Sequence, residues 1–311
     1  MPIKRKERVS QKVRNLALKD RVTLYNKALR LKKRNSGPSK VAGLLGISEK
    51  TVEHWFYEKS NPLGCYNMFK EKPSKELSYV IGVTLGDASL WKSGTGRYID
   101  LQVVDADFAN KFALCLTKLV KPCSVKSGHV NRVTIGCKLL YNFLKRDLNY
   151  LKPFIERFPK EFIQGVADSE GTASVSVYKH GGQLRFDVRT VVAFNASNRL
   201  LTYVKFLLKK FFNIESNLTL YSKAGRINTM KGRIIVTTKN DYMLGISKYN
   251  HVKKFNKLIG FSVQRKRKRM LESIVIRDKY GSGPEAAEAW LELYKKLRGK
   301  WVKTDTVDNG S

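Results

Sequence analysis

Hydrophobic and polar positions follow the same order in two successive parts of the chain, residues 75–152 and 153–274. Each part begins with an apolar, Gly-containing helix and continues with two strands, an amphipathic helix, two shorter strands and a final helix. In the second part the shorter strands are expected near 214–222 and 233–238, with helices from about 239. This order predicts an α+β fold of two αββαββα repeats related by pseudo-twofold symmetry.

The alternating strands also predict a sheet with one solvated face in each repeat. In "GRYIDLQVV" the apolar Ile99, Leu101 and Val103 alternate with polar residues, and "QLRFDVRTVVAF" alternates in the same way. A plain solvated face would explain one such strand, but polar faces in both repeats suit hydrogen bonding to base edges. The residues predicted to contact DNA from the sheets are Arg97, Tyr98, Asp100, Gln102, Arg185, Asp187, Arg189 and Arg233.

Net charge narrows the class of partner. Sixty Lys and Arg against 26 Asp and Glu give a formal charge of +34, spread along all 311 residues. Such a self-repelling surface predicts a polyanionic partner, and nucleic acid is the usual one. An anionic membrane surface and a structural role on the ribosome are the alternatives. No apolar run approaches the ~20 residues of a membrane span.

The cysteines and the N-terminus indicate the compartment. The four cysteines form no CxxC pair and have no His at ligand spacing, which argues against zinc and for a reducing environment. The basic N-terminus is not followed by an apolar stretch, so it is not a secretory signal. We predict an intracellular protein, cytoplasmic or nucleoid-associated, with an organelle left open.

Residues 38–57, "PSKVAGLLGISEKTVEHWFY", have the spacing of a DNA-binding helix-turn-helix. Gly46 breaks the first helix at the turn, and Ser48 can cap the second. Ala42 is small where the helices would cross, and Val52 would pack back against the first helix. An ordinary helical hairpin is the alternative, and the basic charge favours DNA contact. We predict a separate helical module over 1–74 that contacts DNA through Lys50, Thr51 and His54.

Both repeats begin with an apolar helix that ends on a carboxylate, Asp87 in "YVIGVTLGDASL" and Glu170 in "FIQGVADSEGTASV". Small residues four positions apart allow the helices to pack closely and bring their C-terminal ends together. Neighbouring carboxylates at helix C-termini are disfavoured unless a cation lies between them. Mg²⁺ suits such oxygen ligands, so the pair predicts metal-assisted hydrolysis of a phosphodiester. The small residues predicted at this interface are Gly82, Gly86, Gly165 and Ser169.

The segments "VIGVTLGDA" (80–88) and "IQGVADSEG" (163–171) resemble the paired motifs of the LAGLIDADG homing endonucleases in their single-chain form. The resemblance covers residues 75–272, and "LIGFSVQRKRKRMLESI" (258–274) is similar to the segment that closes the second repeat. It implies paired motif helices at the interface of the repeats and two antiparallel sheets that form a saddle on duplex DNA. It also implies cleavage of both strands with divalent metal, Mg²⁺ or Mn²⁺, bound by Asp87 and Glu170. Ala88 departs from the glycine that is usual there.

The resemblance further implies helper residues around the two acids. Gln102 fits the family's strand-borne residue that orients active-site water, whereas the matching position in the second repeat, near Ala193, cannot do so. Lys138 and Lys239, at predicted strand-to-helix junctions, are candidates for the family's basic helper. We predict Lys239 in the catalytic set with Asp87, Glu170 and Gln102.

The sequence therefore predicts a monomeric, site-specific double-strand DNA endonuclease with a long asymmetric recognition site. A non-cleaving DNA-binding transcriptional regulator on the same fold is one alternative, and an intron maturase with RNA as its partner is another. Residues 275–311 are predicted as a C-terminal helical extension, with a helix in "GPEAAEAWLELYKKLRGK". The basic run "QRKRKR" (264–269) is predicted to lie against phosphate.

Overall fold

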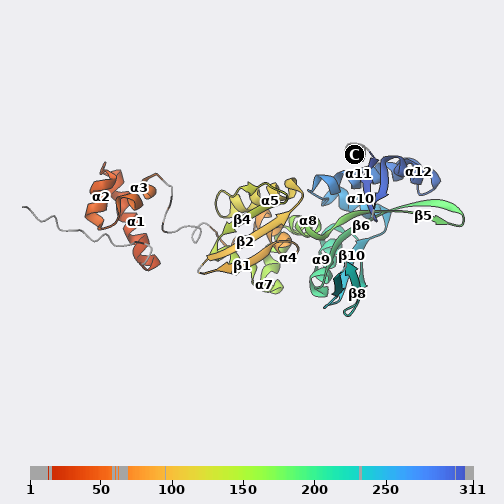
Figure 1. The fold of residues 1–311 in the computed structure, drawn as a ribbon, viewed down its shortest axis with the longest axis horizontal. Coiled ribbons are helices and arrows are strands. Elements are labelled where there is room, and N and C mark those ends of the chain that lie inside the picture. The colour runs from red at the N-terminus through yellow and green to blue at the C-terminus, as the bar shows by residue number, and fades with distance from the viewer. Residues whose placement is uncertain are drawn as a thin grey trace, which may run out of the picture. The chain divides into compact units, whose positions relative to one another are not determined.

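The structure is a computed structural model that describes residues 13, 16–57, 60, 62, 69–94, 96–230, 233–297 and 299–304 (Figure 1). The chain divides into two units, Met1–Lys70 and Glu71–Ser311. None of the helices within the described ranges combines the length and the apolar character that a membrane crossing requires.

The first unit packs three helices around a small core. They are α1 (Leu18–Lys33), α2 (Pro38–Leu45) and α3 (Glu49–Phe56). α2 ends at Gly46, whose φ of 66° is a left-handed conformation that glycine accepts without strain. Ser48 caps α3, because its side chain accepts a hydrogen bond from the Thr51 N–H at 3.3 Å. Val52 is fully buried between the helices. The helix pair has the bounds and the turn expected from the sequence, while DNA contact by α3 stays a prediction.

The second unit begins with the first predicted repeat. Its elements are α4 (Lys75–Leu85), β1 (Ser89–Ser93), β2 (Gly96–Val103), α5 (Ala106–Leu119), β3 (Val125–Lys126), β4 (Asn131–Gly136), α6 (Lys138–Leu144) and α7 (Leu148–Arg157). The strands form an antiparallel sheet in the order β1-β2-β4-β3. Ile99 and Leu101 of β2 are fully buried on the face that α5 covers. The other face of this sheet carries the polar side chains.

The second repeat has the same plan. Its main elements are α8 (Pro159–Glu170), β5 (Thr172–His180), β6 (Gln183–Asn195), α9 (Asn198–Phe212), β7 (Asn217–Ser222), β10 (Asp241–Ile246) and α10 (Tyr249–Leu258). The sheet order β5-β6-β10-β7 corresponds to that of the first sheet. The predicted α+β fold of two αββαββα repeats is confirmed, and α4 and α8 lie side by side between the two sheets (Figure 1).

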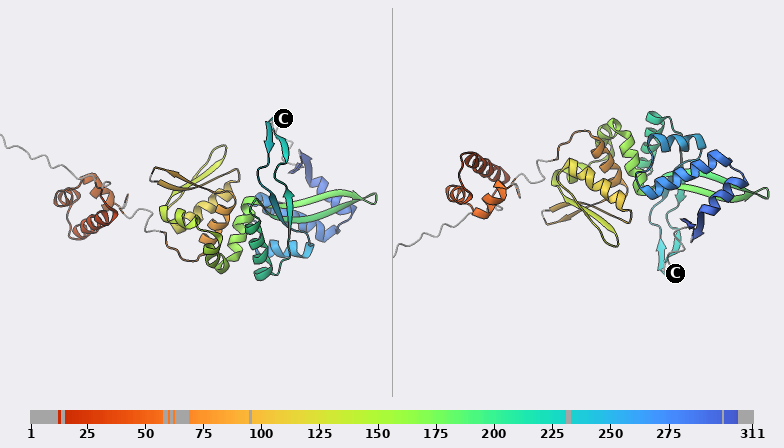
Figure 2. Two further views of the ribbon diagram at one scale, coloured as in Figure 1. Left: turned by 90° about the horizontal axis from the view of Figure 1, so that it is seen from below. Right: turned by 90° about the horizontal axis from the view of Figure 1, so that it is seen from above.

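The structure corrects the sequence prediction between β7 and α10. Within the described part of the chain, β8 (Ile227–Met230) and β9 (Arg233–Val236) pair with each other and with no other strand, and they form a hairpin that projects from the sheet (Figure 2). The strand expected at 233–238 is therefore not part of the main sheet. β10 takes that place, although a helix was expected from about 239, and it pairs with both β6 and β7. A short apolar run does not distinguish strand from helix by its own pattern, so the pairing partners decide.

The C-terminal segment is also only partly helical. It consists of α11 (Gln264–Tyr280), α12 (Pro284–Leu293), β11 (Tyr294–Leu297) and β12 (Lys300–Lys303). The predicted boundary after residue 274 falls within α11, and a hairpin replaces the end of the predicted extension helix. Gly299 forms its turn with a φ of 79°. Trp301 anchors the hairpin, because its indole N–H donates to the carbonyl of Val175 at 2.8 Å and its ring packs edge-on against Trp290.

A buried carboxylate connects α8 with α4 and with the segment that precedes α11. Asp168 is 1% exposed and accepts hydrogen bonds from the Ser262 N–H at 2.8 Å and the Val263 N–H at 3.4 Å. It also accepts from the Ser262 hydroxyl and, at 2.9 Å, from the Tyr79 hydroxyl of the first repeat. Lys111 Nζ lies 3.9 Å from the same carboxylate. Asp168 therefore fixes where α11 begins relative to both motif helices.

Replacement of this carboxylate is expected to destabilise the second unit. Asp168→Ala should lower the free energy of unfolding by about 3–5 kcal/mol, because buried donors and a lysine are deprived of their acceptor. Asp147→Ala is the matched control, since Asp147 is an exposed helix cap that accepts from the Asn149 and Tyr150 N–H groups. Removal of this cap should cost about 1 kcal/mol. Urea unfolding measures both values, and equal destabilisation by the two variants would contradict the structural role of Asp168.

Candidate active site

Asp87 and Glu170 lie at the adjoining ends of α4 and α8. Gly86 is the C-cap of α4 and Asp87 follows it directly, while Glu170 is the last residue of α8. A Cβ built on Gly86 would lie 2.5 Å from the Cβ of Ser169 and 3.4 Å from the Cγ of Glu170. The two helix ends therefore meet at Asp87 and Glu170, the acid pair.

The helices meet so closely because glycines face each other along the contact. A Cβ on Gly82 would lie 2.3 Å from the carbonyl oxygen of Phe162. A Cβ on Gly165 would lie 2.5 Å from the carbonyl oxygen of Tyr79. Real Cβ atoms do not approach backbone oxygens to these distances, so only glycine permits this helix separation.

The two carboxyls of the acid pair influence each other electrostatically. Asp87 remains accessible to solvent and Glu170 is half-buried, yet desolvation by the surrounding protein raises the pKa of both. The charge of Asp87 raises the pKa of Glu170 further, and Asp241 at the start of β10 adds to this effect. Negative charge thus accumulates here, and a bound cation would favour the ionised form of both groups.

Lys266 brings a positive charge to the acid pair. It lies in the first turn of α11, is 7% exposed, and donates from Nζ to the carbonyl oxygens of Ala167 at 3.2 Å, Asp168 at 2.5 Å and Ser169 at 3.3 Å. These carbonyls form the C-terminal end of α8, where a cation is favourable. Lys266 lowers the pKa of both acids, against the effect of desolvation. Burial lowers the pKa of Lys266 itself.

The sequence prediction missed Lys266, because the run "QRKRKR" was treated as one basic face. In the structure the basic residues of this run lie in different environments. Lys266 is buried together with Val263, Met270 and Ser273, which share its face of α11 at helical spacing. Arg265 instead pairs with Asp105 of the first repeat. The spacing of Lys266 relative to Val263 and Met270 is the signal that would have separated it from the solvated basic residues.

The two carboxylates of the acid pair suit an open magnesium site more than a site in which the protein supplies every metal ligand. No group of three or more His, Cys, Asp or Glu side chains that could hold a metal ion occurs among the described residues. A metal at the acid pair would therefore take its other ligands from water, backbone oxygens or a phosphate. Mg²⁺ is commonly held in that way, by one or two carboxylates together with water and substrate phosphate.

Asp100 and Gln102 form a hydrogen-bonded group on the polar face of the first sheet. Gln102 is exposed and donates to Asp100 at 2.9 Å. Asp100 also accepts from Arg132 Nε at 2.8 Å and from the Thr134 hydroxyl, which leaves it 4% exposed. Asp100 therefore orients Gln102 and Arg132, and it offers little surface to a base. Ala193, the position that corresponds to Gln102 in the second sheet, is fully buried.

The two candidate helper lysines lie in different settings. Lys138 begins α6 with one residue between it and the end of β4, at a strand-to-helix junction as expected. Lys239 is exposed and precedes β10, so it is not at such a junction. The junction in the second repeat is occupied by Lys248, the N-cap residue of α10, which pairs with Glu215 at 2.5 Å. This corrects the placement of Lys239, which followed from the misassigned strand.

Tyr98 and Arg97 lie on opposite faces of β2. Tyr98 shares the polar face and stacks on Trp91, with ring centroids 4.2 Å apart. Arg97 points the other way, because side chains alternate along a strand. Its guanidinium donates to the carbonyls of Gly94 at 3.1 Å and Gly96 at 2.9 Å, within its own hairpin. Arg97 therefore does not share the polar face with Tyr98, and its contact with DNA stays a prediction.

The polar face of the second sheet carries Arg185, Asp187 and Arg189 of β6. Asp187 accepts a hydrogen bond from the Tyr178 hydroxyl at 3.0 Å and lies 3.6 Å from Arg189. A cavity of about 480 Å³ hollows this face, and its polar lining includes Ser174, Ser176, Asn217 and Thr219. Arg233 begins β9, and its side chain lies outside the described residues. Lys50, Thr51 and His54 lie on α3 of the first unit.

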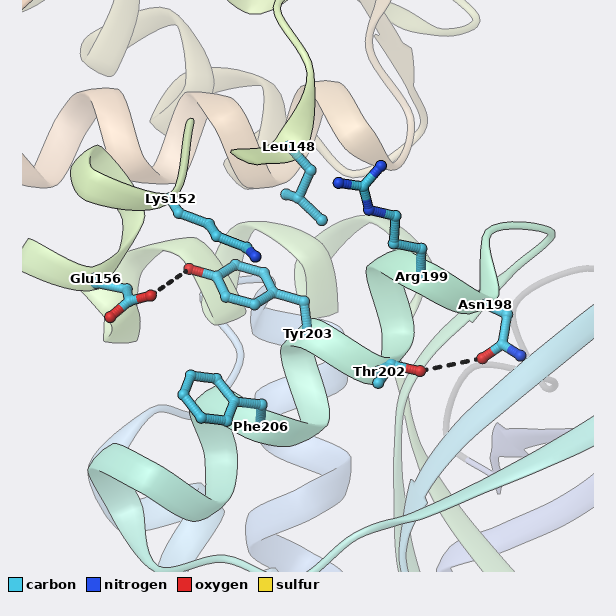
Figure 3. A pocket seen from close by; sticks show the side chains of 8 residues that line it. All are labelled: Leu148, Lys152, Glu156, Asn198, Arg199, Thr202, Tyr203 and Phe206. Atoms are coloured by element: carbon cyan, nitrogen blue, oxygen red, sulfur yellow. Dashed lines mark hydrogen bonds between the residues drawn. The ribbon is translucent and has the colours of Figure 1, made fainter. Parts of the chain in front are cut away.

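Figure 3 shows a larger cavity, of about 620 Å³, between α7 and α9. It contains neither acid of the pair. Its carboxylate, Glu156, accepts from the Tyr203 hydroxyl at 3.4 Å and pairs with Lys210 at 3.0 Å. Because its only carboxylate is already engaged, we assign the candidate site to the acid pair and not to this cavity.

Comparisons with known proteins give distant similarities. No family model matches the chain. An uncharacterized protein of Methanocaldococcus jannaschii is 28% identical over 282 residues, which cover 86% of this chain and 99% of that protein. The chain is also similar to the structure of I-DmoI in complex with DNA and Mn, at 19% identity and a TM-score of 0.40, covering 60% of this chain and 96% of that one.

Two further solved structures are similar at lower identity. The LAGLIDADG meganuclease I-AabMI bound to uncleaved DNA is 12% identical with a TM-score of 0.43, over 65% of this chain and 90% of that chain. Full-length DUF199/WhiA from Thermatoga maritima is 13% identical with a TM-score of 0.36, over 66% of this chain and 62% of that chain.

Proposed function

We propose that this protein is a site-specific DNA endonuclease that hydrolyses phosphodiesters with divalent metal held by Asp87 and Glu170. The observation that supports this most is the meeting of these carboxylates at the closely packed ends of α4 and α8, next to Lys266. The polar faces of the two sheets and the charge of +34 support duplex DNA as the substrate. When bound, the metal polarises the phosphate and lowers the pKa of the attacking water.

The residues of the chain have separate roles in this proposal. Asp87 and Glu170 bind Mg²⁺ or Mn²⁺. Gln102, held by its hydrogen bond to Asp100, orients water beside the scissile phosphate. Tyr98, Arg185, Asp187 and Arg189 contact the duplex from the polar faces, and Lys50, Thr51 and His54 contact DNA from the first unit.

The test uses a library of random-sequence duplexes, because the residues of the acid pair do not specify which DNA sequence is recognised. The full chain is incubated with the library and Mg²⁺, and the new DNA ends are captured and sequenced. We expect double-strand ends at one recurring sequence in Mg²⁺ and none in EDTA. Sequence-specific binding without ends in Mg²⁺ or Mn²⁺ would instead establish the second candidate, a non-cleaving DNA-binding regulator, which the helix pair α2–α3 favours.

We further propose that Lys266 is the basic group that acts beside the acid pair, in place of Lys239. Lys266→Met should lower cleavage by roughly 10²-fold, the usual effect of removing one preorganised charge from an active site. The same variant should bind Mn²⁺ more tightly, because a positive charge beside the acids repels a metal cation.

Lys257→Met, on the exposed surface of α10, is the control and should change neither value. Lys266→Arg should restore part of the cleavage. A purely structural lysine would lower cleavage and metal affinity together, and that result would contradict the proposed role.

A further inference from the structure

We propose that a cavity between α11 and the C-terminal hairpin binds a phosphate of the DNA backbone, outside the two sheets. The cavity has a volume of about 300 Å³. The basic residues Arg265, Lys268, Arg269 and Lys303 line it, together with Tyr294 and Trp301. The inference rests on the proposed function only in that duplex DNA supplies the phosphate.

Two of the four basic residues have carboxylate partners. Arg265 donates twice to Asp105, at 3.1 and 2.9 Å, and Lys303 lies 2.8 Å from Glu272. Lys268 is exposed and has no carboxylate within ion-pair distance in the described part of the chain. The cavity therefore retains a surplus of positive charge.

Arg269 adds an unmet hydrogen-bond donor. Its terminal nitrogen donates to the carbonyl of Trp301 at 2.8 Å, and its guanidinium lies over the ring of Tyr294. Its Nε is buried and has no acceptor among the described residues. Buried N–H groups normally have a hydrogen-bond acceptor from the protein or from an ordered water molecule. A water molecule could accept from Nε, but only an anion would also balance the charge of the cavity.

A phosphate supplies both the hydrogen-bond acceptors and the negative charge that this cavity lacks. It carries several acceptor oxygens and a negative charge, and guanidinium and ammonium groups together are its usual protein ligands. Lys268 and Arg269 are the two basic lining residues that have no carboxylate within ion-pair distance in the described part of the chain, so their charge is left for it.

The surroundings favour a phosphate within a polymer over a free one. A neighbouring cavity of about 410 Å³ shares Arg265 and Lys268 and adds Arg267, so basic hollows continue along α11. The hairpin is fixed to β5 by the hydrogen bond from Trp301 to Val175. β5 is one of the two edge strands of the second sheet, so the cavity lies beside an edge of that sheet. A strand of DNA would present successive phosphates to such a row, whereas a free anion would use one hollow only.

The test is the salt dependence of DNA binding by the full chain, in EDTA so that cleavage plays no part. A labelled random-sequence duplex is titrated between roughly 50 and 200 mM NaCl for the wild-type protein and for Lys268→Ala/Arg269→Gln. We expect the variant to bind more weakly, with a slope of log K against log salt that is shallower by about 1, because one phosphate is no longer neutralised. Lys254→Gln/Lys257→Ala is the control, because it also removes two positive charges, from α10, and should keep the wild-type slope.

The outcomes separate this inference from the proposed function. An unchanged slope in the double variant, together with no thermal shift of the wild-type protein by inorganic phosphate, overturns the phosphate site and leaves the endonuclease proposal intact. A thermal shift with inorganic phosphate that the double variant abolishes, combined with an unchanged slope for DNA, overturns the DNA backbone as the source. Absence of DNA binding at every salt concentration overturns both. If Arg269→Gln does not fold, the exposed Lys268→Glu variant carries the same test.

Discussion

Asp87→Asn and Glu170→Gln are each expected to lower metal-dependent double-strand cleavage by about 10³-fold or more, while DNA binding persists. Removal of one ligand takes away several kcal/mol of metal stabilisation at the phosphate, and each 1.36 kcal/mol is a factor of ten in rate. Binding persists because it depends on Lys and Arg contacts to the backbone, and removal of a carboxylate reduces repulsion of DNA. Cleavage of the selected duplex in Mg²⁺ and equilibrium binding in EDTA measure the two effects.

Asp147→Asn is the matched control for both acid variants. Asp147 is an exposed carboxylate at the N-cap of α7, in the same unit, so its conversion to the amide removes one negative charge without touching either acid of the pair. It should retain wild-type cleavage. Full activity of either acid variant would remove the acid pair from the mechanism, and a variant that neither binds nor cleaves DNA would indicate misfolding instead.

Gly82→Ala is expected to destabilise the second unit by about 3 kcal/mol, at the upper end of the cost of overpacking. The new Cβ would lie 2.3 Å from the carbonyl oxygen of Phe162 and 3.0 Å from the backbone nitrogen of Val166. Because backbone atoms cannot change rotamer, α4 and α8 must separate. For a unit of this size the destabilisation corresponds to a fall in Tm of roughly 6–12 °C. Thermal denaturation of the full chain measures it.

Gly165→Ala should have a similar effect, since its Cβ would lie 2.5 Å from the carbonyl oxygen of Tyr79. The double variant should cost less than the sum of the two, because both substitutions separate the same helices. Gly128→Ala is the control, because the nearest atom to its Cβ is an ordinary 3.6 Å away. A Tm for Gly82→Ala equal to that of Gly128→Ala would show that the helix contact is looser than the structure has it.

The elements with long, regular patterns were predictable from the sequence. The alternation of Ile99 and Leu101 with polar neighbours predicted β2, and the spacing of Gly46 and Ser48 predicted the turn between α2 and α3. These features are fixed by local preferences, since a strand pattern or a helix cap depends on residues close together in the chain. Where the local pattern was weak, as in "DYMLGI", the prediction failed and pairing with β6 and β7 decided the outcome.

The candidate site also has features that the sequence determined and others that only the tertiary structure decided. The repeated motif by itself determined that Asp87 and Glu170 occupy equivalent positions on two helices with small residues at the contact. Only the tertiary structure decided that Lys266, 96 positions after Glu170 in the chain, donates to the end of α8. It also decided that Arg97 faces away from the other polar residues of β2, and that a hairpin follows α12 beside β5. The physical reason is range: helix ends and strand faces follow from neighbouring residues, whereas the partner of a buried charge is set by whichever distant segment packs against it.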